Sequence, residues 1–261
     1  MKNHFRAGFS LLEMAIVLII LGIILGAGVP YFKQSQAQGR LKETKNRQEQ
    51  IIQAIASYVL LHDELPCPAR MDAEVGQHGV SAQDCADVAS AIGMVPYFTL
   101  GLSESTAKDG YNQWMIYAVP PHMHSHGPVL GRQNREPMIC RLRVMETIVL
   151  KDKNNRLLGT KWQDGRPDPD DYIAALLIST GGSHGGDANQ MERTNLDASL
   201  NFYDLPFGVK SGSFGHMVKW VTLRNLMGVY AQKPCQSLRL GEDDIHAEPR
   251  SPLGDPFGRG D

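Results

Sequence analysis

A single acid, Glu13, lies near the start of a long apolar stretch that runs from Phe9 to Val29. An ionisable side chain inside a membrane-length helix costs about 2.5–3.5 kcal/mol on insertion scales, so it is expected to have a partner or a task there. Cleavage of the chain after Gly8 would create such a partner, because the new amino terminus of Phe9 is a cation. We therefore expect the Glu13 carboxylate to neutralise that amino terminus on a neighbouring copy.

Residues 181–185 match the Gly-x-Ser-x-Gly pattern of hydrolase nucleophiles and follow an apolar segment. The nucleophile elbow must lead directly from its serine, here Ser183, into a helix packed on a parallel sheet. The residues that follow form a polar stretch instead, which indicates a loop. We find no complete catalytic constellation in the sequence, which therefore predicts that the protein is not an enzyme.

Three histidines alternate along the chain, at positions 122, 124 and 126. Alternate residues of a strand share a face, so His122, His124 and His126 would suit a transition metal if this segment were extended in a sheet. Prolines on both sides of the segment indicate an exposed loop instead. We interpret the three as surface histidines and predict no cofactor.

The apolar stretch has the length of a membrane span, because residues 9–29 at ~1.5 Å per residue cover about 31 Å, close to the ~30 Å hydrocarbon core. The plausible cut after Gly8 precedes the stretch and leaves it on the mature protein as an anchor. Lys2 and Arg6 lie on the short side, which places the amino terminus in the cytoplasm and the rest of the chain outside. An ordinary single-span anchor is the alternative, but it gives no reason for Glu13.

The N-terminal region resembles the type IV pilin and type II secretion pseudopilin family, whose leader ends in Gly, followed by Phe, a Glu as the fifth mature residue and an apolar helix. The matching residues are Lys2, Arg6, Gly8, Phe9, Glu13, Gly22 and Pro30. The resemblance implies that prepilin peptidase, in the inner membrane, cuts between Gly8 and Phe9 and methylates the amino terminus of Phe9. It also implies that Glu13 acts in assembly with other pilin or pseudopilin subunits, and that residues 22–30 unwind in assembled fibres.

Some members of this family bind calcium in Gly-rich loops, and Asp187, Asn189 and Glu192 offer oxygen ligands in such a stretch. Their spacing fits no EF-hand. The sequence therefore predicts no metal site, with these three residues as the alternative calcium ligands.

The four cysteines all lie on the side of the chain expected to be exported, where a Gram-negative periplasm would oxidise them. Four cysteines allow three connectivities, and the sequence does not choose among them. Cys67 and Cys85 flank a loop rich in Gly and Asp and would form the local pair, which leaves Cys140 for Cys235. None of the four belongs to a Cys-x-x-Cys pair, which disfavours zinc.

Apolar residues at helical spacing continue over residues 51–60, so we expect one curved helix of about fifty residues. Pro30 should kink this helix without ending it, and the Leu-Pro-Cys-Pro step at residues 65–68 should end it. The segments expected as strands are Trp114–Val119, Ile139–Met145, Tyr172–Thr180 and Met217–Leu223, the last as a strand or the lead-in to a short helix.

This order predicts an α+β fold in which a long N-terminal helix packs on an antiparallel sheet and disulfides stabilise the domain. The expected organisation is a leader at 1–8, a transmembrane half-helix at 9–29, a periplasmic half-helix at 30–64, a globular domain at 65–241 and a disordered tail at 242–261. A net charge of -2 and 42% hydrophobic residues favour a globular domain and give no sign of direct nucleic-acid binding.

Two classes of function fit these features. The first is a minor pilin or pseudopilin, a structural subunit of a type IV pilus or type II secretion-like fibre that starts in the inner membrane and extends into the periplasm or to the cell surface. The second is an anchored periplasmic adhesin or enzyme that uses the pilin-like amino terminus only for sorting. The absence of a complete catalytic pattern favours the first.

Overall fold

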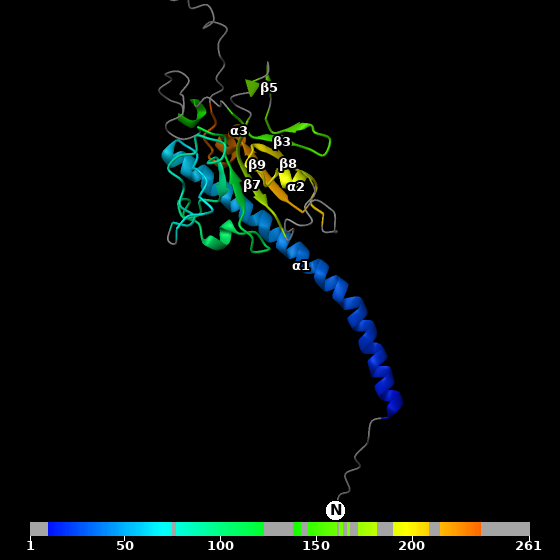
Figure 1. Ribbon diagram of the computed structural model, residues 1–261. Helices are drawn as coiled ribbons and strands as arrows, with labels where there is room; N and C mark the ends of the chain where they lie inside the picture. Colours follow the sequence, from blue (N-terminus) through cyan, green and yellow to red (C-terminus); the bar gives the residue numbers. More distant parts are fainter. Residues whose placement is uncertain are drawn as a thin grey trace, which may run out of the picture.

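The computed structural model describes residues 10–74, 77–122, 138–141, 146–160, 162–163, 166–167, 172–181, 190–208 and 215–235. One long helix carries a small α+β domain at its C-terminal half, and its N-terminal half projects away from that domain (Figure 1). The α+β prediction is confirmed by this arrangement.

Helix α1 spans Leu11–His62 and is continuous through Pro30. It is curved, as Figure 1 shows. Residues 22–30, which the resemblance expects to unwind in assembled fibres, are helical in this single chain. At its C-terminal end, Asp63 takes the left-handed conformation (φ 57°) and its N–H donates to the carbonyl oxygen of Val59. This cap stops the helix before the prolines that were expected to end it.

The main sheet has four antiparallel strands in the order β1-β2-β7-β9. Their bounds are Ile92–Met94 for β1, Ile116–Ala118 for β2, Ile173–Ser179 for β7 and Met217–Thr222 for β9. All seven residues of β7 are buried, because this central strand is covered on both faces, and the prediction of a buried strand in Tyr172–Thr180 is confirmed.

A second sheet has the order β4-β3-β8, with β3 at Val149–Lys151, β4 at Leu157–Leu158 and β8 at Asn201–Tyr203. Strands β5 (Trp162–Gln163) and β6 (Arg166–Pro167) form a separate pair. The short helices are η1 (Glu104–Ala107), η2 (Met138–Arg141), α2 (Gln190–Thr194), α3 (Leu223–Asn225) and η3 (Leu226–Tyr230, a π-helix).

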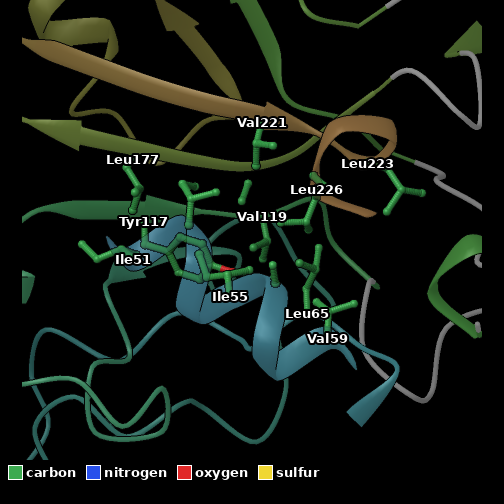
Figure 2. Close-up of a cluster of buried hydrophobic side chains, with 14 of the residues drawn as sticks. Ile51, Ile55, Val59, Leu65, Tyr117, Val119, Leu177, Val221, Leu223 and Leu226 are labelled. Carbon is green, nitrogen blue, oxygen red and sulfur yellow. The ribbon is translucent and has the colours of Figure 1, made fainter. Parts of the chain in front are cut away.

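The core has two clusters, one on each face of the main sheet. On one face, Ile51, Ile55 and Val59 of α1 pack beneath Tyr117 and Leu177 (Figure 2). On the other face, a second cluster joins the main sheet to the second sheet, and its members include Ile173, Leu176, Ile178, Leu150 and Phe202. The domain is thus three layers, with the second half of α1 as the outer layer on one side.

One of the strand predictions needs correction. Ile139–Met145 was expected to be a strand, but Met138–Arg141 form the 3-10 helix η2, and residues 142–145 lie outside the described residues. The neighbours Ile139 and Cys140 are both buried, which the alternating faces of a half-buried strand do not allow. The expected antiparallel sheet is present as the main sheet, whereas the second sheet also contains a parallel pair, β3 with β8.

The strand expected at Met217–Leu223 is confirmed, and it is followed at once by α3, so both alternatives for this segment are partly right. The strand expected at Trp114–Val119 is present but shorter, as β2. In the part of the chain that the structure describes, no helix combines the length and hydropathy needed to cross a lipid bilayer. The tail expected at 242–261 lies outside the described residues.

Candidate functional site

The first turn of α1 carries Glu13 and is capped by Ser10. Ser10 is extended, and its Oγ accepts a 3.3 Å hydrogen bond from the backbone N–H of Leu12. This bond satisfies one of the N–H groups that a helix leaves without a partner at its start. A carboxylate in the first turn also interacts favourably with the helix dipole. Glu13 is exposed, so no part of the chain that the structure describes covers it.

The helix surface beyond this turn is apolar and exposed. Every residue from Leu11 to Ile23 is exposed, and the large apolar side chains in this stretch range from 44% exposure at Val17 to 91% at Leu11. Contiguous apolar surface of this kind marks a site of contact with protein or membrane. The N-terminal half of α1 is therefore the candidate functional site of the molecule.

The residues that the sequence singled out fall partly within this site. Gly8 and Phe9, the predicted cleavage and methylation residues, lie outside the described residues. Glu13 lies in the first turn of α1, and Gly22 lies further along the same exposed stretch. A Cβ built on Gly22 would meet nothing within 4 Å, so in the single chain this glycine leaves an open notch on the helix surface. Such a notch suits close packing by another helix.

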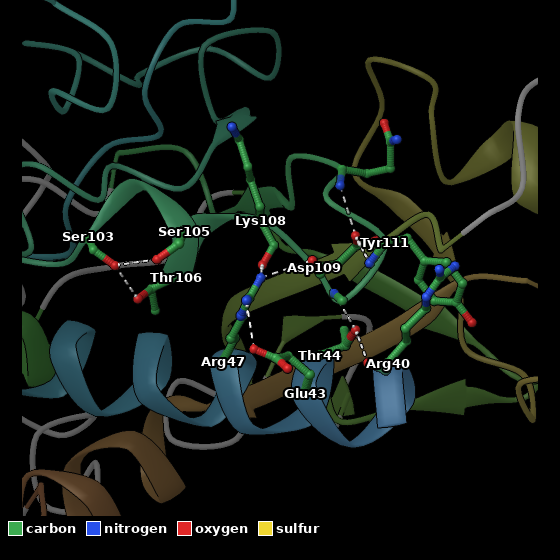
Figure 3. Close-up of polar contacts among 12 residues, drawn as sticks. Arg40, Glu43, Thr44, Arg47, Ser103, Ser105, Thr106, Lys108, Asp109 and Tyr111 are labelled. Carbon is green, nitrogen blue, oxygen red and sulfur yellow. Dashed lines mark hydrogen bonds and ion pairs between the residues drawn. The ribbon is translucent and has the colours of Figure 1, made fainter. Parts of the chain in front are cut away.

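A polar junction fixes α1 to the domain just before the apolar core begins (Figure 3). The guanidinium of Arg47 donates from Nη1 to the carbonyl oxygens of Lys108 (2.9 Å) and Asp109 (3.0 Å). The backbone N–H of Gly110 donates to Oγ1 of Thr44 at 2.9 Å. Thr44 is fully buried, so its hydroxyl would be costly to leave without a partner.

The carboxylate of Asp109 ties this junction to the main sheet. Its Oδ2 accepts hydrogen bonds from Oγ of Ser179 (2.6 Å) and from the backbone N–H of Gly181 (3.2 Å). Its Oδ1 accepts from the backbone N–H groups of Tyr111 (2.8 Å) and Gln113 (2.9 Å). One carboxylate therefore joins the loop before β2 to the end of β7.

Sequence reasoning missed this junction. The Asp-Gly-Tyr-Asn stretch at Asp109–Asn112 has the residue types of a turn, and its backbone forms one, with the N–H of Asn112 donating to the carbonyl oxygen of Asp109 at 3.0 Å. The turn residues gave a usable signal for the position of Asp109. They gave none for its partners, since Thr44 and Ser179 lie far away in the sequence.

A second buried polar cluster lies beside the start of β9. Glu192 and His216 are 2% and 1% exposed, and the Glu192 carboxylate accepts a hydrogen bond from the N–H of Gly215. Nδ1 of His216 lies 3.5 Å from Nδ2 of Asn195, which also donates to the carbonyl oxygen of Tyr203. Burial lowers the pKa of His216 below its usual range, and the Glu192 carboxylate opposes that shift.

The four cysteines form two disulfides, Cys67–Cys85 and Cys140–Cys235. This confirms the expectation of two bridges and the local pairing of Cys67 with Cys85. The first bridge closes the loop after α1, and the second ties η2 to the segment after η3, across 95 residues.

The sequence patterns that imitate active sites are only partly visible. Of residues 181–185, Gly181 alone is described, and its N–H is bonded to Asp109. His122 is partly buried, whereas His124 and His126 lie outside the described residues. Glu192 is described and buried, and Asp187 and Asn189 are not among the described residues. No group of three or more metal-binding side chains occurs among the residues that the structure describes.

Comparison with known proteins places the N-terminal motif in a family. Residues 3–29 match the family model of the prokaryotic N-terminal methylation motif, which is the signature of type IV pilins and pseudopilins. The motif therefore indicates a type IV pilin-like or pseudopilin protein, and a membrane-anchored or envelope location. Searches of curated proteins and of solved structures found no match.

Proposed function

We propose that this protein is a minor pilin or pseudopilin, a structural subunit of a type IV pilus or a type II secretion-like fibre, and not an enzyme. The observation that supports this most is the N-terminal half of α1. It carries the methylation motif, exposes apolar residues from Leu11 to Ile23 and projects from the domain. A helix of this kind needs other helices or lipid around it, and both are available to a subunit that passes from a membrane into a fibre.

Before assembly, prepilin peptidase would remove residues 1–8 and methylate the amino terminus of Phe9. Residues 9–29 would then hold the subunit in the inner membrane, with the domain in the periplasm. The two disulfides support this side of the membrane, because disulfides persist in oxidising compartments such as the periplasm.

Glu13 would act during assembly. In an apolar surrounding its carboxylate is strongly attracted to the cationic amino terminus of Phe9 on the next subunit, because charges interact more strongly where the dielectric constant is low. The pair would set the axial position of one helix against the next. Glu13 lies in the first turn of α1 and is exposed, so its carboxylate is accessible to such a neighbour.

The test replaces Glu13 and follows incorporation. Glu13→Gln keeps the size of the side chain and removes the charge, so processing and membrane insertion should persist while co-purification and cross-linking with other pilin-like subunits fall. Glu146→Gln, at an exposed acid of the domain, is the matched control and should incorporate like the wild type. Membrane levels of all three proteins are matched before comparison.

Equal incorporation of Glu13→Gln and wild type would contradict the intersubunit role. That result would favour the second class of function, an anchored periplasmic adhesin or enzyme, because such a protein needs no neighbouring subunit.

A further inference from the structure

Helix α1 meets the rest of the domain first through polar contacts, not through the apolar core. Among the α1 residues whose side chains are described, Thr44 is the first buried one from the N-terminal end. The buried apolar residues of the helix begin later, at Ile51. Any pull on the N-terminal half of α1 therefore reaches the contacts of residues 40–48 before it reaches the core.

These contacts converge on the segment Lys108–Gln113. Arg47 binds the carbonyl oxygens of Lys108 and Asp109, and Thr44 accepts from the N–H of Gly110, as Figure 3 shows. The guanidinium of Arg40 also lies over the ring of Tyr111, 5.3 Å from its centroid. Three successive turns of one helix thus contact a single short segment.

The segment lies directly against the helix backbone. A Cβ on Gly110 would stand 2.3 Å from the carbonyl oxygen of Arg40, closer than any real side chain comes to a backbone atom. Only glycine allows this approach, and the approach is what brings the Gly110 N–H to Thr44.

The far side of the segment is bonded to the main sheet. Oδ2 of Asp109, which is 1% exposed, accepts from Oγ of Ser179 at 2.6 Å and from the N–H of Gly181. Ser179 ends β7, a central strand of the four-stranded sheet. A continuous path of hydrogen bonds therefore runs from α1 through Asp109 to the sheet.

We propose that the segment Lys108–Gln113 is a mechanical latch, which holds α1 against the sheet when tension acts along the helix. The source of the tension rests on the proposed function, because a subunit held in a fibre by the N-terminal half of α1 has its domain pulled against that helix. The latch itself is a property of the single chain and is tested without a fibre.

The experiment is force spectroscopy on the full chain in detergent, with attachment through introduced cysteines. All four native cysteines are in disulfides, so introduced thiols are the reactive ones. In the first geometry the load passes through the latch, between Gln38→Cys on the exposed part of α1 and Leu157→Cys on β4. In the second geometry the load bypasses both residues 38–48 and the segment Lys108–Gln113, because it acts between Met71→Cys and Phe98→Cys, both at exposed side chains.

Thr44→Val removes the acceptor of the Gly110 N–H with almost no change in size. Thr194→Val is the matched control: the Thr194 hydroxyl donates to the carbonyl oxygen of Gln190 four residues earlier, just as the Thr44 hydroxyl donates to that of Arg40, but among the described residues it bonds no other segment. In the first geometry, Thr44→Val should shorten the lifetime under constant load about five-fold, equivalent to ~1 kcal/mol for one hydrogen bond. Thr194→Val should match the wild type there.

The second geometry separates a latch from general stability. Thr44→Val should have the lifetime of the wild type in that geometry, whereas an equal loss in both geometries would show a merely stabilising contact and overturn the proposal. Amide hydrogen exchange gives a further readout, since Gly110 should exchange faster in Thr44→Val than in the wild type, and unchanged exchange would also contradict the latch. Failure of the Glu13 experiment would leave these results untouched.

Discussion

The hydroxyl of Ser179 donates a 2.6 Å hydrogen bond to the carboxylate of Asp109, and the two residues are 70 positions apart in the chain. Both are almost completely buried, at 0% and 1% exposure. The bond joins the end of β7 to the loop at residues 108–113, which also hydrogen-bonds Thr44 and Arg47 of α1. This loop therefore connects two layers of the domain. A buried carboxylate is tolerated there because four hydrogen-bond donors surround it.

Removal of the two partners should therefore have unequal effects on stability. Ser179→Ala loses one donor and should lower the free energy of unfolding by about 1 kcal/mol, whereas Asp109→Ala leaves several buried donors without an acceptor and should cost about 3 kcal/mol or more. Urea denaturation at neutral pH measures both. Equal losses for the two variants would show that the carboxylate does not organise this loop.

Acid should weaken the corner of the domain around His216. Burial lowers the folded-state pKa of His216 from an unfolded value of 6.5, so the native state prefers the neutral ring. The associated stability is present above pH ~6.5 and is lost as the pH falls from there towards the folded pKa. The melting temperature of the wild type should thus fall between pH 7.5 and pH 5.5 by more than that of His216→Gln.

Exposed His78→Gln is the control for this titration and should follow the wild type. The charged groups near His216 are the same in the wild type and in His216→Gln, so they contribute to the pH dependence of both proteins. These groups are Glu192, Lys45, Glu49, Asp204 and Lys219. The pKa of Asp204 is raised by burial, which gives stability at low pH and so has the opposite sign. Parallel pH profiles for wild type and His216→Gln would rule out His216 as the source.

The bridge between Cys140 and Cys235 should be worth more than the bridge between Cys67 and Cys85. The Cys140–Cys235 bridge closes a loop of 95 residues, and the Cys67–Cys85 bridge closes a loop of 18 residues. In the chain-entropy model a longer closed loop gives more stabilisation, within a typical range of about 2–4 kcal/mol. Paired Cys→Ser variants, compared by urea denaturation, measure the difference. Thiol counting on the unreduced, denatured wild type should find no reactive thiol, and four thiols would contradict both bridges.

The apolar contact of α1 with the main sheet should depend on its inward side chains alone. Ile55 is fully buried under the sheet, so Ile55→Ala should cost about 2–5 kcal/mol. Leu61, 81% exposed on the same helix, is the matched position, and Leu61→Ala should change stability by less than about 0.5 kcal/mol. Thermal or urea unfolding measures both variants. Similar losses in the free energy of unfolding would contradict the packing of the Ile55 side of α1 against the main sheet.

Processing should depend on Gly8. A bulky charged residue at the cut site should block the peptidase, so Gly8→Arg should keep its leader, whereas the wild type should lose residues 1–8. Mass spectrometry of the membrane-extracted protein gives the mature terminus. A terminus at Met1, or one after residue 30, would contradict the proposed processing.

Much of the molecule was predictable because the relevant information is local. The methylation motif is a run of neighbouring residues, so the sequence alone indicated it, and the family model matches at residues 3–29. The roles expected of Gly8, Phe9 and Glu13 within the motif stay predictions. The continuous apolar run of β7 predicted a strand buried on both faces. The apolar spacing from Ile51 to Val59 likewise predicted the buried face of α1.

The tertiary structure decided what depends on partners far away in the chain. Cys140 lies in a helical turn and not in a strand, because its position is set by packing and by Cys235. The parallel pairing of β3 with β8 joins two short segments whose local patterns carry no orientation. Thr44, Asp109 and Ser179 are ordinary surface residue types in the sequence. They become a buried network only because the fold removes them from water together, and unpaired polar groups would be too costly there.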